Sequence, residues 1–315
     1  MAGSFRDRVT APRVVAIDWS GRSGPAQRHA IWLGDARDGE LVRLGSGRSR
    51  DEIVAFLIGE AERDSRLVVG LDCAFSLPAW YLRQRGLSAR SLWSALAAEA
   101  LTPAMRRAGL AVWMNLPEAP FWTTREGHAL QGGRQPFRRT ELELRSPGIS
   151  PKSAFQLVGA GQVGRGSLYG MKALHRLAAA GFHVWPFEPA GFPLVVEIFP
   201  RVLTGPVVKS SALARTDYLA TQPMRPDLKA LAAASEDAFD AAVSALAMAR
   251  VAHGFAALPD APDHRAEGKI WKPEANGPDR AGAQSGPWSM AAPGVSSRRT
   301  PACRPARPCD PSAAR

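Results

Sequence analysis

Short apolar runs that end in turn-forming residues predict the strands of this chain. The run Val14–Asp18 leads into the turn-rich segment WSGRSGP, and the apolar segments HAIWLG (29–34) and ELVRLG (40–45) follow it. An Asp-Gly pair lies between the last two segments, so the three runs predict an antiparallel series of strands. The run Leu67–Asp72 (LVVGLD) is almost continuously apolar, which is typical of a central strand covered on both faces.

Apolar residues at helical spacing predict three long helices. The segment Arg50–Arg63 has an apolar stripe and two acids in its first turn, where negative charge suits the helix dipole. A second helix is predicted over Ser167–Ala180, followed by strands at Phe182–Phe187 and Leu194–Phe199. The third, Ser235–His253, is nearly free of Gly and Pro and is apolar on most faces, so we expect it to be buried.

This order of elements predicts one α/β domain over residues 1–271. We expect a mixed sheet of five or more strands that opens with three antiparallel strands and has helices on both faces. Residues 78–151 form an insertion rich in Arg, Trp and Pro, whose elements the pattern does not define. Beyond Trp271, Pro, Gly, Ser and Arg occur without periodicity, which predicts a disordered tail over 272–315.

The composition is that of an ordinary globular protein. Of 315 residues, 45% are hydrophobic and 22% charged, no apolar run reaches the length of a membrane span, and no secretory signal is recognisable. We therefore expect a cytoplasmic protein with no membrane partner. Three cysteines, Cys73, Cys303 and Cys309, form neither a disulfide framework nor a zinc pattern.

The positive charge makes nucleic acid an expected partner. A formal net charge of +11 attracts polyanions, although Arg-rich composition also reflects GC-rich genomes. In the insertion, basic residues alternate with aromatic ones, a pattern that suits phosphate contacts and base stacking. The alternative is a solvated insertion whose aromatic residues pack underneath. The residues concerned are Arg83, Arg85, Arg90, Arg106, Arg107, Arg125, Arg134, Arg138, Arg139 and Lys152, with Trp93, Trp113, Phe121, Trp122 and Phe137.

Acids interrupt the apolar runs where a core is expected. Asp18 closes VVAID, Asp72 closes LVVGLD, and Glu197 lies inside LVVEIF. A buried carboxylate costs several kcal/mol unless it is paired, hydrogen-bonded or bound to a metal. One such residue can simply cap a turn, as Asp18 could before Ser20. Three of them together favour a shared function.

The last predicted helix adds two more acids. Asp237 and Asp240 lie three residues apart and therefore project from one helix face. Asp237 could instead serve only the helix dipole behind an N-cap at Ser235, but Asp240 lies about one turn further in. Carboxylates that converge at low dielectric repel one another, and Mg²⁺ or Mn²⁺ relieves this repulsion. Two such ions about 4 Å apart suit phosphodiester hydrolysis.

Six segments occur in an order that resembles the family called domain of unknown function 429. They are VVAIDWSG, VVGLDCAFSLP, FQLVGAGQVGRGSLYGM, VVEIFP, SEDAFDAAVSALAMAR and EGKIW, and they span Val14–Trp271. The resemblance implies a ribonuclease H-like fold and a metal-dependent nuclease. The layout is also similar, more distantly, to Holliday-junction resolvases, and this implies that Asp18, Asp72, Asp237 and Asp240 are metal ligands. Glu197 matches the family's own VEIFP segment but has no clear resolvase counterpart.

Three other functions remain open at this level. Gly159–Gly164 matches G-x-G-x-x-G before a predicted helix, with Glu188 downstream, as in a nicotinamide or other dinucleotide site. The Asp18 turn is also similar to a phosphate turn of actin-like sugar kinases, but the segment after Asp72 lacks their second D-x-G turn. The third alternative is a catalytically inactive relative that binds nucleic acid.

Overall fold

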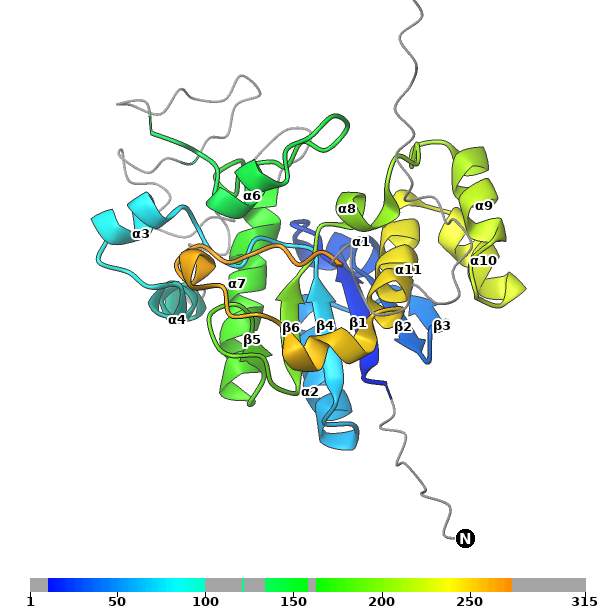
Figure 1. Ribbon diagram of the computed structural model, residues 1–315, viewed down its shortest axis with the longest axis horizontal. Coiled ribbons are helices and arrows are strands. Elements are labelled where there is room, and N and C mark those ends of the chain that lie inside the picture. Colours follow the sequence, from blue (N-terminus) through cyan, green and yellow to red (C-terminus); the bar gives the residue numbers. More distant parts are fainter. Residues whose placement is uncertain (1–10, 100–120, 122–133, 158–162, 274–315) are drawn as a thin grey trace, which may run out of the picture. The chain divides into compact units, whose positions relative to one another are not determined.

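The structure is α/β, with a mixed sheet and helices on both of its faces (Figure 1), as the order of elements predicted. The computed structural model describes residues 11–99, 121, 134–157 and 163–273. The predicted tail lies outside the described residues except for Lys272 and Pro273. No helix in the described ranges is long and apolar enough to cross a membrane.

In the described part, six strands form the sheet in the order β3-β2-β1-β4-β6-β5. The strand β2 runs antiparallel to its neighbours β1 and β3, whereas β1, β4, β6 and β5 are parallel to one another. The three opening strands are therefore antiparallel, as predicted. The bounds are β1 Arg13–Asp18, β2 Trp32–Arg37, β3 Glu40–Gly45, β4 Leu67–Leu71, β5 His183–Val184 and β6 Leu194–Glu197.

Two strands differ from the sequence pattern: β2 has the predicted length of six residues but begins three residues later, and β5 is shorter than predicted. The strand β2 begins at Trp32 because its partner in β1, Asp18, is the last residue of that strand, and the preceding Gln27–Ala30 forms the short helix α1. The strand β5 ends at Val184, two residues before Pro186, which has no N–H group to donate to a ladder.

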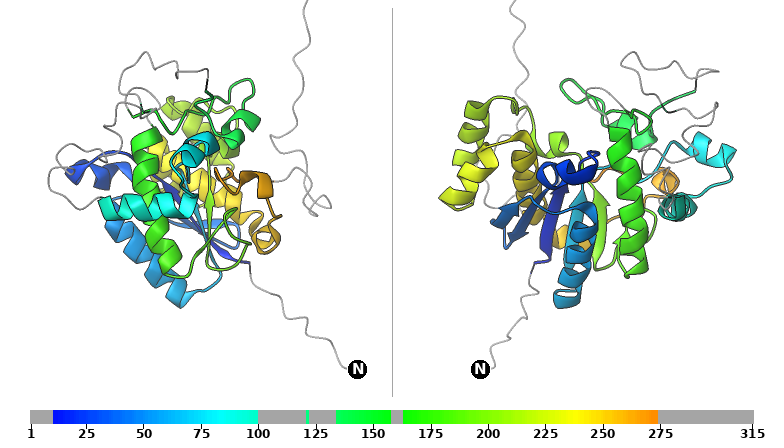
Figure 2. Two further views of the ribbon diagram at one scale, coloured as in Figure 1. Left: turned by 90° about the vertical axis from the view of Figure 1, so that its left-hand side faces the viewer. Right: turned by 180° about the vertical axis from the view of Figure 1, so that it is seen from behind.

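Helices cover the two faces of the sheet separately (Figure 2). The helices α2 (Arg50–Arg63) and α7 (Val163–Ala179) lie over one face, and α11 (Glu236–Ala249) lies over the other. Side chains of β1 alternate between them: Val15 and Ile17 belong to the core under α2 and α7, and Val14 and Ala16 belong to the core under α11. Even positions of β1 therefore share a face with α11.

Small residues let α11 lie close to the sheet. Gly34, Ala16 and Gly70 are paired in one row across β2, β1 and β4. A Cβ atom at Gly34 would lie 2.5 Å from the carbonyl oxygen of Ala241 on α11, and one at Gly70 would lie 2.6 Å from the sulfur of Met248. This close approach fixes the position of α11 relative to the carboxyl ends of β1 and β4.

We expect Gly34→Ala to lower the free energy of unfolding by about 1–3 kcal/mol, because the new methyl group overlaps a helix backbone that cannot rotate away. Gly45→Ala is the matched control, since a Cβ atom there meets nothing within 4 Å. Urea denaturation of both variants measures the difference. If Gly34→Ala were as stable as Gly45→Ala, the close helix packing described here would be wrong.

The remaining helices lie in the insertion and in the connections after β6. The described part of the insertion is not only a solvated loop: Trp93 is fully buried and donates to the carbonyl of Phe75 (2.7 Å). The α-helices are α3 (Ala79–Gln84), α4 (Ala89–Glu99), α6 (Arg139–Glu143), α8 (Pro200–Thr204), α9 (Ala212–Ala220) and α10 (Pro226–Ala233). Short 3₁₀ helices occur at Gly24–Ala26, Ala252–Ala257 and Pro262–His264.

Candidate functional site

Asp18 and Asp72 lie side by side at the carboxyl ends of two parallel strands. Asp18 ends β1, and the backbone N–H of Asp72, one residue past β4, donates to the carbonyl of Ile17 (3.0 Å). The strand pairing therefore continues to the two acids, and the Asp18 side chain is close enough to Asp72 to influence its pKa. Both occupy even positions, which face α11.

The first two turns of α11 bring in the other two aspartates. Ser235 caps the helix by accepting from the N–H of Ala238 (3.1 Å), as the dipole interpretation of Asp237 assumed. Asp237 lies in the first turn and is exposed, whereas Asp240 is 8% exposed. One oxygen of Asp240, Oδ2, accepts from Lys209, and the other, Oδ1, is buried without a hydrogen-bond partner among the described residues.

The electrostatics of the four acids indicate one shared site. Burial raises the pKa of Asp18 well above its usual value, and the charges of the other three aspartates raise it further. Burial and the charge of Asp240 raise the pKa of Asp72 to about 8. Burial also raises the pKa of Asp240, to about 6, although Lys209 opposes that shift. These interactions extend over a few ångströms, so the structure brings together Asp18, Asp72, Asp237 and Asp240.

Lys209 is the positive charge in this group, and the sequence reasoning missed it. It lies in the connection between α8 and α9, with its side chain 20% exposed, and it forms an ion pair with Asp240. Its charge lowers the pKa of Asp18, Asp72 and Asp237 as well. The sequence around Lys209 contains no motif that would mark it as functional. It lies about 30 residues before Asp240, so the sequence gives no sign that the two side chains pair.

In the described ranges, no three His, Cys, Asp or Glu side chains are arranged to enclose a metal ion. The aspartates are near one another, and one of them, Asp240, contacts the ammonium group of Lys209. The residues that could hold a divalent cation are the four aspartates, which offer only oxygen atoms.

Glu197 lines the same cavity as Asp72, as expected, but its carboxylate is not part of the aspartate group. It pairs with Leu71 and therefore occupies the row of β6 that faces α7, opposite to the α11 face. There Arg138 donates to both carboxylate oxygens (2.8 and 2.5 Å), and the N–H of Phe75 donates as well (3.0 Å). Its charge still raises the pKa of Asp72, but its oxygens are engaged by Arg138 and Phe75.

Arg138 holds three separate segments together. Besides Glu197, it donates to Glu141 of α6 (2.8 Å) and to the carbonyl of Glu267 (2.9 Å). Its side chain is about 1% exposed. Arg138 is therefore unavailable for the contact with nucleic acid suggested by the basic pattern of the insertion. Arg106, Arg107, Trp113, Trp122 and Arg125 of that pattern lie outside the described residues.

The N-terminal half of α7 positions the loops that carry Asp18 and Asp72. Trp19 donates through its ring nitrogen to the carbonyl of Gly166 (3.0 Å), and the N–H of Ala74 donates to the hydroxyl of Ser167 (3.0 Å). Gly170 leaves room for Cys73, whose sulfur would lie 2.3 Å from a Cβ atom there. The glycines of this helix therefore serve close packing.

The dinucleotide alternative requires a strand immediately before the glycine run. Residues 151–157 contain a turn and a single bridge position but no strand, and Gly164 already belongs to α7. The N–H of Gly164 donates to the carbonyl of Gln156 (2.8 Å). Gly159 and Gly161 lie outside the described residues. The described part of the segment therefore lacks the strand-loop-helix order of a dinucleotide site.

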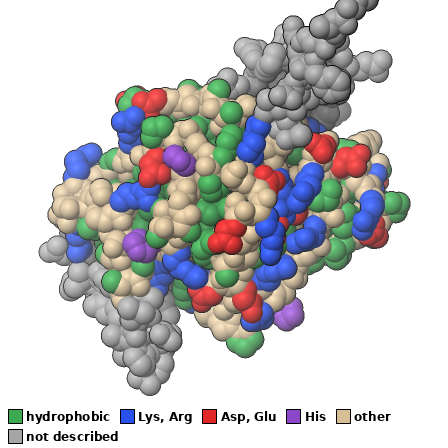
Figure 3. All heavy atoms as spheres, turned by 90° about the horizontal axis from the view of Figure 1, so that it is seen from below, with side chains coloured by type: hydrophobic (Ala, Val, Ile, Leu, Met, Phe, Trp, Pro, Cys, Tyr) green, Lys and Arg blue, Asp and Glu red, His purple; other side chains and the backbone are tan. Residues whose placement is uncertain are grey.

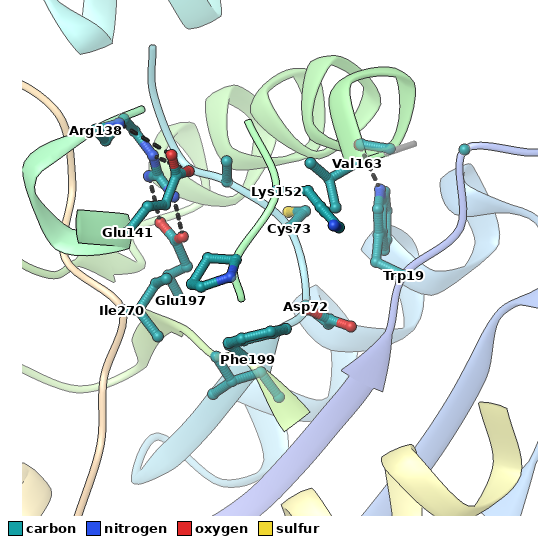
Figure 4. Close-up of a pocket in the computed structure, with 15 residues that line it drawn as sticks. Trp19, Asp72, Cys73, Arg138, Glu141, Lys152, Val163, Glu197, Phe199 and Ile270 are labelled. Atoms are coloured by element: carbon teal, nitrogen blue, oxygen red, sulfur yellow. Dashed lines mark hydrogen bonds and ion pairs between the residues drawn. The ribbon is translucent and has the colours of Figure 1, made fainter. Parts of the chain in front are cut away.

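A cavity of about 130 Å³ opens beside Asp72 (Figure 4). The loops after β1, β4 and β6 form part of its wall through Trp19, Cys73 and Phe199. The Arg138–Glu197 pair lies at one side, and Lys152, directly after the insertion, lies near Trp19. The opposite end of the sheet, seen from below in Figure 3, carries basic and acidic side chains next to one another.

The raised pKa values predict that the metal-free protein loses stability as pH rises from about 5.5 to 8. In the unfolded chain Asp72 releases its proton near pH 3.8, whereas in the fold it retains the proton up to about pH 8. The unfolded state therefore binds fewer protons in this range, so the free energy of unfolding falls with pH.

Urea denaturation in the presence of a chelator measures this decline, and Asp72→Asn should lessen it. Carboxylates with a lowered pKa, such as Glu52 at about 2, change stability only in more acidic solution. If the free energy of unfolding of Asp72→Asn fell as steeply with pH as that of the unmodified chain, the raised pKa of Asp72 would not be the cause of the decline.

A search with family models found no match to this chain, and searches of curated proteins and of solved structures found none either.

Proposed function

We propose that this chain is a metal-dependent nuclease with a ribonuclease H-like arrangement of its sheet. The observation that carries the proposal is the convergence of Asp18, Asp72, Asp237 and Asp240: the charges of the other three aspartates raise the pKa of Asp18, and the charge of Asp240 raises that of Asp72. Proteins tolerate such mutual repulsion mainly at functional sites.

The order and direction of the strands support the proposed ribonuclease H-like arrangement. Five strands follow the order β3-β2-β1-β4-β6, and β2 alone is antiparallel to the others. The first acid, Asp18, is the last residue of the central strand β1, the second follows its parallel neighbour β4, and the last pair lies in the first two turns of the helix that covers both. This is the layout that the resemblance implies.

The donor atoms fit a hard divalent cation. All four side chains offer carboxylate oxygens, and the buried Oδ1 of Asp240 has no partner among the described residues. Because the side chains do not enclose an ion as they stand, binding requires carboxylate rotations, and Asp240 must share or release Lys209. When bound, Mg²⁺ or Mn²⁺ supplies an activated water and stabilises the leaving oxygen in phosphodiester hydrolysis.

The chain's own residues have separate tasks in this proposal. The four aspartates hold the ions, and the backbone hydrogen bond from Asp72 to the carbonyl of Ile17 keeps Asp18 and Asp72 adjacent. Lys209 orients Asp240 and keeps a positive charge where phosphate oxygens would arrive.

Basic residues beside the first loop support a polyanionic substrate. Arg50 donates to the carbonyl of Ser20 (2.5 Å) and lies over the ring of Tyr169, 4.0 Å from its centroid. It forms no ion pair with a described residue, and Arg22, near Asp237, is exposed. The exposed guanidinium group of Arg22 suits phosphate contacts, whereas that of Arg50 is already engaged by the carbonyls of Ser20 and Arg22.

The test is a cleavage screen on single-stranded, duplex, hybrid and branched nucleic acids. We expect hydrolysis with Mg²⁺ or Mn²⁺ and none with a chelator, together with metal binding by calorimetry. If no substrate is cleaved and neither metal binds, the inactive, nucleic-acid-binding alternative is favoured.

A further inference from the structure

Three kinds of side chain line the cavity beside Asp72: aromatic rings, an aspartate and a buried ion pair. Aromatic rings of Trp19 and Phe199 line it, and the Trp19 ring is held in place by its hydrogen bond to Gly166. Asp72, a member of the aspartate group, lies at one end of the cavity. The Arg138–Glu197 ion pair lies at another side (Figure 4). The cavity is therefore partly aromatic and adjoins the proposed site of hydrolysis.

Lys152 supplies an uncompensated positive charge to this cavity. It is exposed and lines the cavity, and it makes no ion pair or hydrogen bond with the described residues. Arg138, the other cation of the lining, is fully engaged by Glu141 and Glu197. An anionic ligand group would therefore meet Lys152 first.

From this combination we propose that the cavity binds one unstacked base of a single-stranded nucleic acid, with Lys152 contacting its phosphate. The inference rests on the proposed nuclease function and names its substrate class. Flat aromatic walls favour a planar base, and a lysine near the aspartates favours the phosphate attached to it.

The size of the cavity indicates that its ligand is a single strand and not a duplex. A cavity of about 150 Å³ in another protein admits benzene, so a space of about 130 Å³ has room for a ring of about this size but not for a base pair. A base within a duplex must first leave its stack, which costs a few kcal/mol, whereas a single strand offers its bases without this cost. The cavity thus favours single strands.

The test measures binding of a labelled single strand and a duplex of equal length by fluorescence anisotropy, with a chelator present. Phe199→Leu keeps an apolar side chain but removes the ring, and Lys152→Gln removes the charge. We expect each change to weaken binding of the single strand about 10-fold and to leave binding of the duplex unchanged. Lys229→Gln, on α10 and outside the cavity lining, is the control and should bind as the unmodified chain does.

Equal affinity for single strand and duplex, or wild-type affinity in both cavity variants, would overturn the inference, as would a complete lack of binding. Because the assay contains no metal, an absence of cleavage does not affect its outcome. A chain that hydrolyses nucleic acid yet shows no single-strand preference would retain the proposed function and lose only this inference. Circular dichroism of each variant excludes a loss of fold.

Discussion

Asp18→Asn is expected to lower the rate of metal-dependent phosphodiester cleavage by about 100-fold or more and to raise the midpoint of thermal unfolding at neutral pH. The rate falls because the amide is a weaker ligand for a cation whose position governs the stabilisation of transition-state charge. Stability rises because Asp18 is one of four mutually repelling acids, and its pKa in the fold lies well above its usual value.

Asp38→Asn is the matched control for this experiment. Asp38 is exposed in the turn between β2 and β3 with a positive φ of 49°, a conformation that asparagine also adopts readily. Both the cleavage rate and the unfolding midpoint should be unchanged. If the cleavage rate of Asp18→Asn were undiminished, Asp18 would not be a metal ligand. A lower unfolding midpoint would contradict the repulsion between Asp18 and the other aspartates.

Arg138→Met should lower the free energy of unfolding by about 3–5 kcal/mol, the usual effect of removing one partner of a buried ion pair. The change leaves Glu197 and Glu141 buried without their counter-ion. It also removes the donor to the carbonyl of Glu267, which links the C-terminal segment of the domain to the insertion. Urea denaturation at neutral pH measures the loss.

The neighbouring Arg139 provides the control. Its side chain is about half exposed and pairs with Glu143 and Asp263 at the surface, so Arg139→Met should barely change the unfolding midpoint. Acidic solution, which protonates the orphaned carboxylates, should reduce the penalty in Arg138→Met. Similar penalties in both variants, independent of pH, would show that Arg138 does not act as a buried counter-ion.

The sequence alone determined the principal strands and helices of this protein. The helix at Arg50–Arg63 has the predicted bounds, and β1 and β4 end at the predicted acids to within one residue. These features depend on local periodicity, which a chain expresses wherever one face of an element is buried. An acid that ends an apolar run is equally visible, so Asp18 and Asp72 could be selected without coordinates.

Only the tertiary structure decided which acids meet. Glu197 resembles Asp72 in its sequence context, yet it pairs with Leu71 and so points to the opposite face of the sheet. A shift of one residue in strand register would reverse that direction, and register depends on long-range pairing. Lys209 and Arg138 became partners of the acids for the same reason: charge pairs between distant segments follow from how the chain packs, and local patterns along the chain do not encode them.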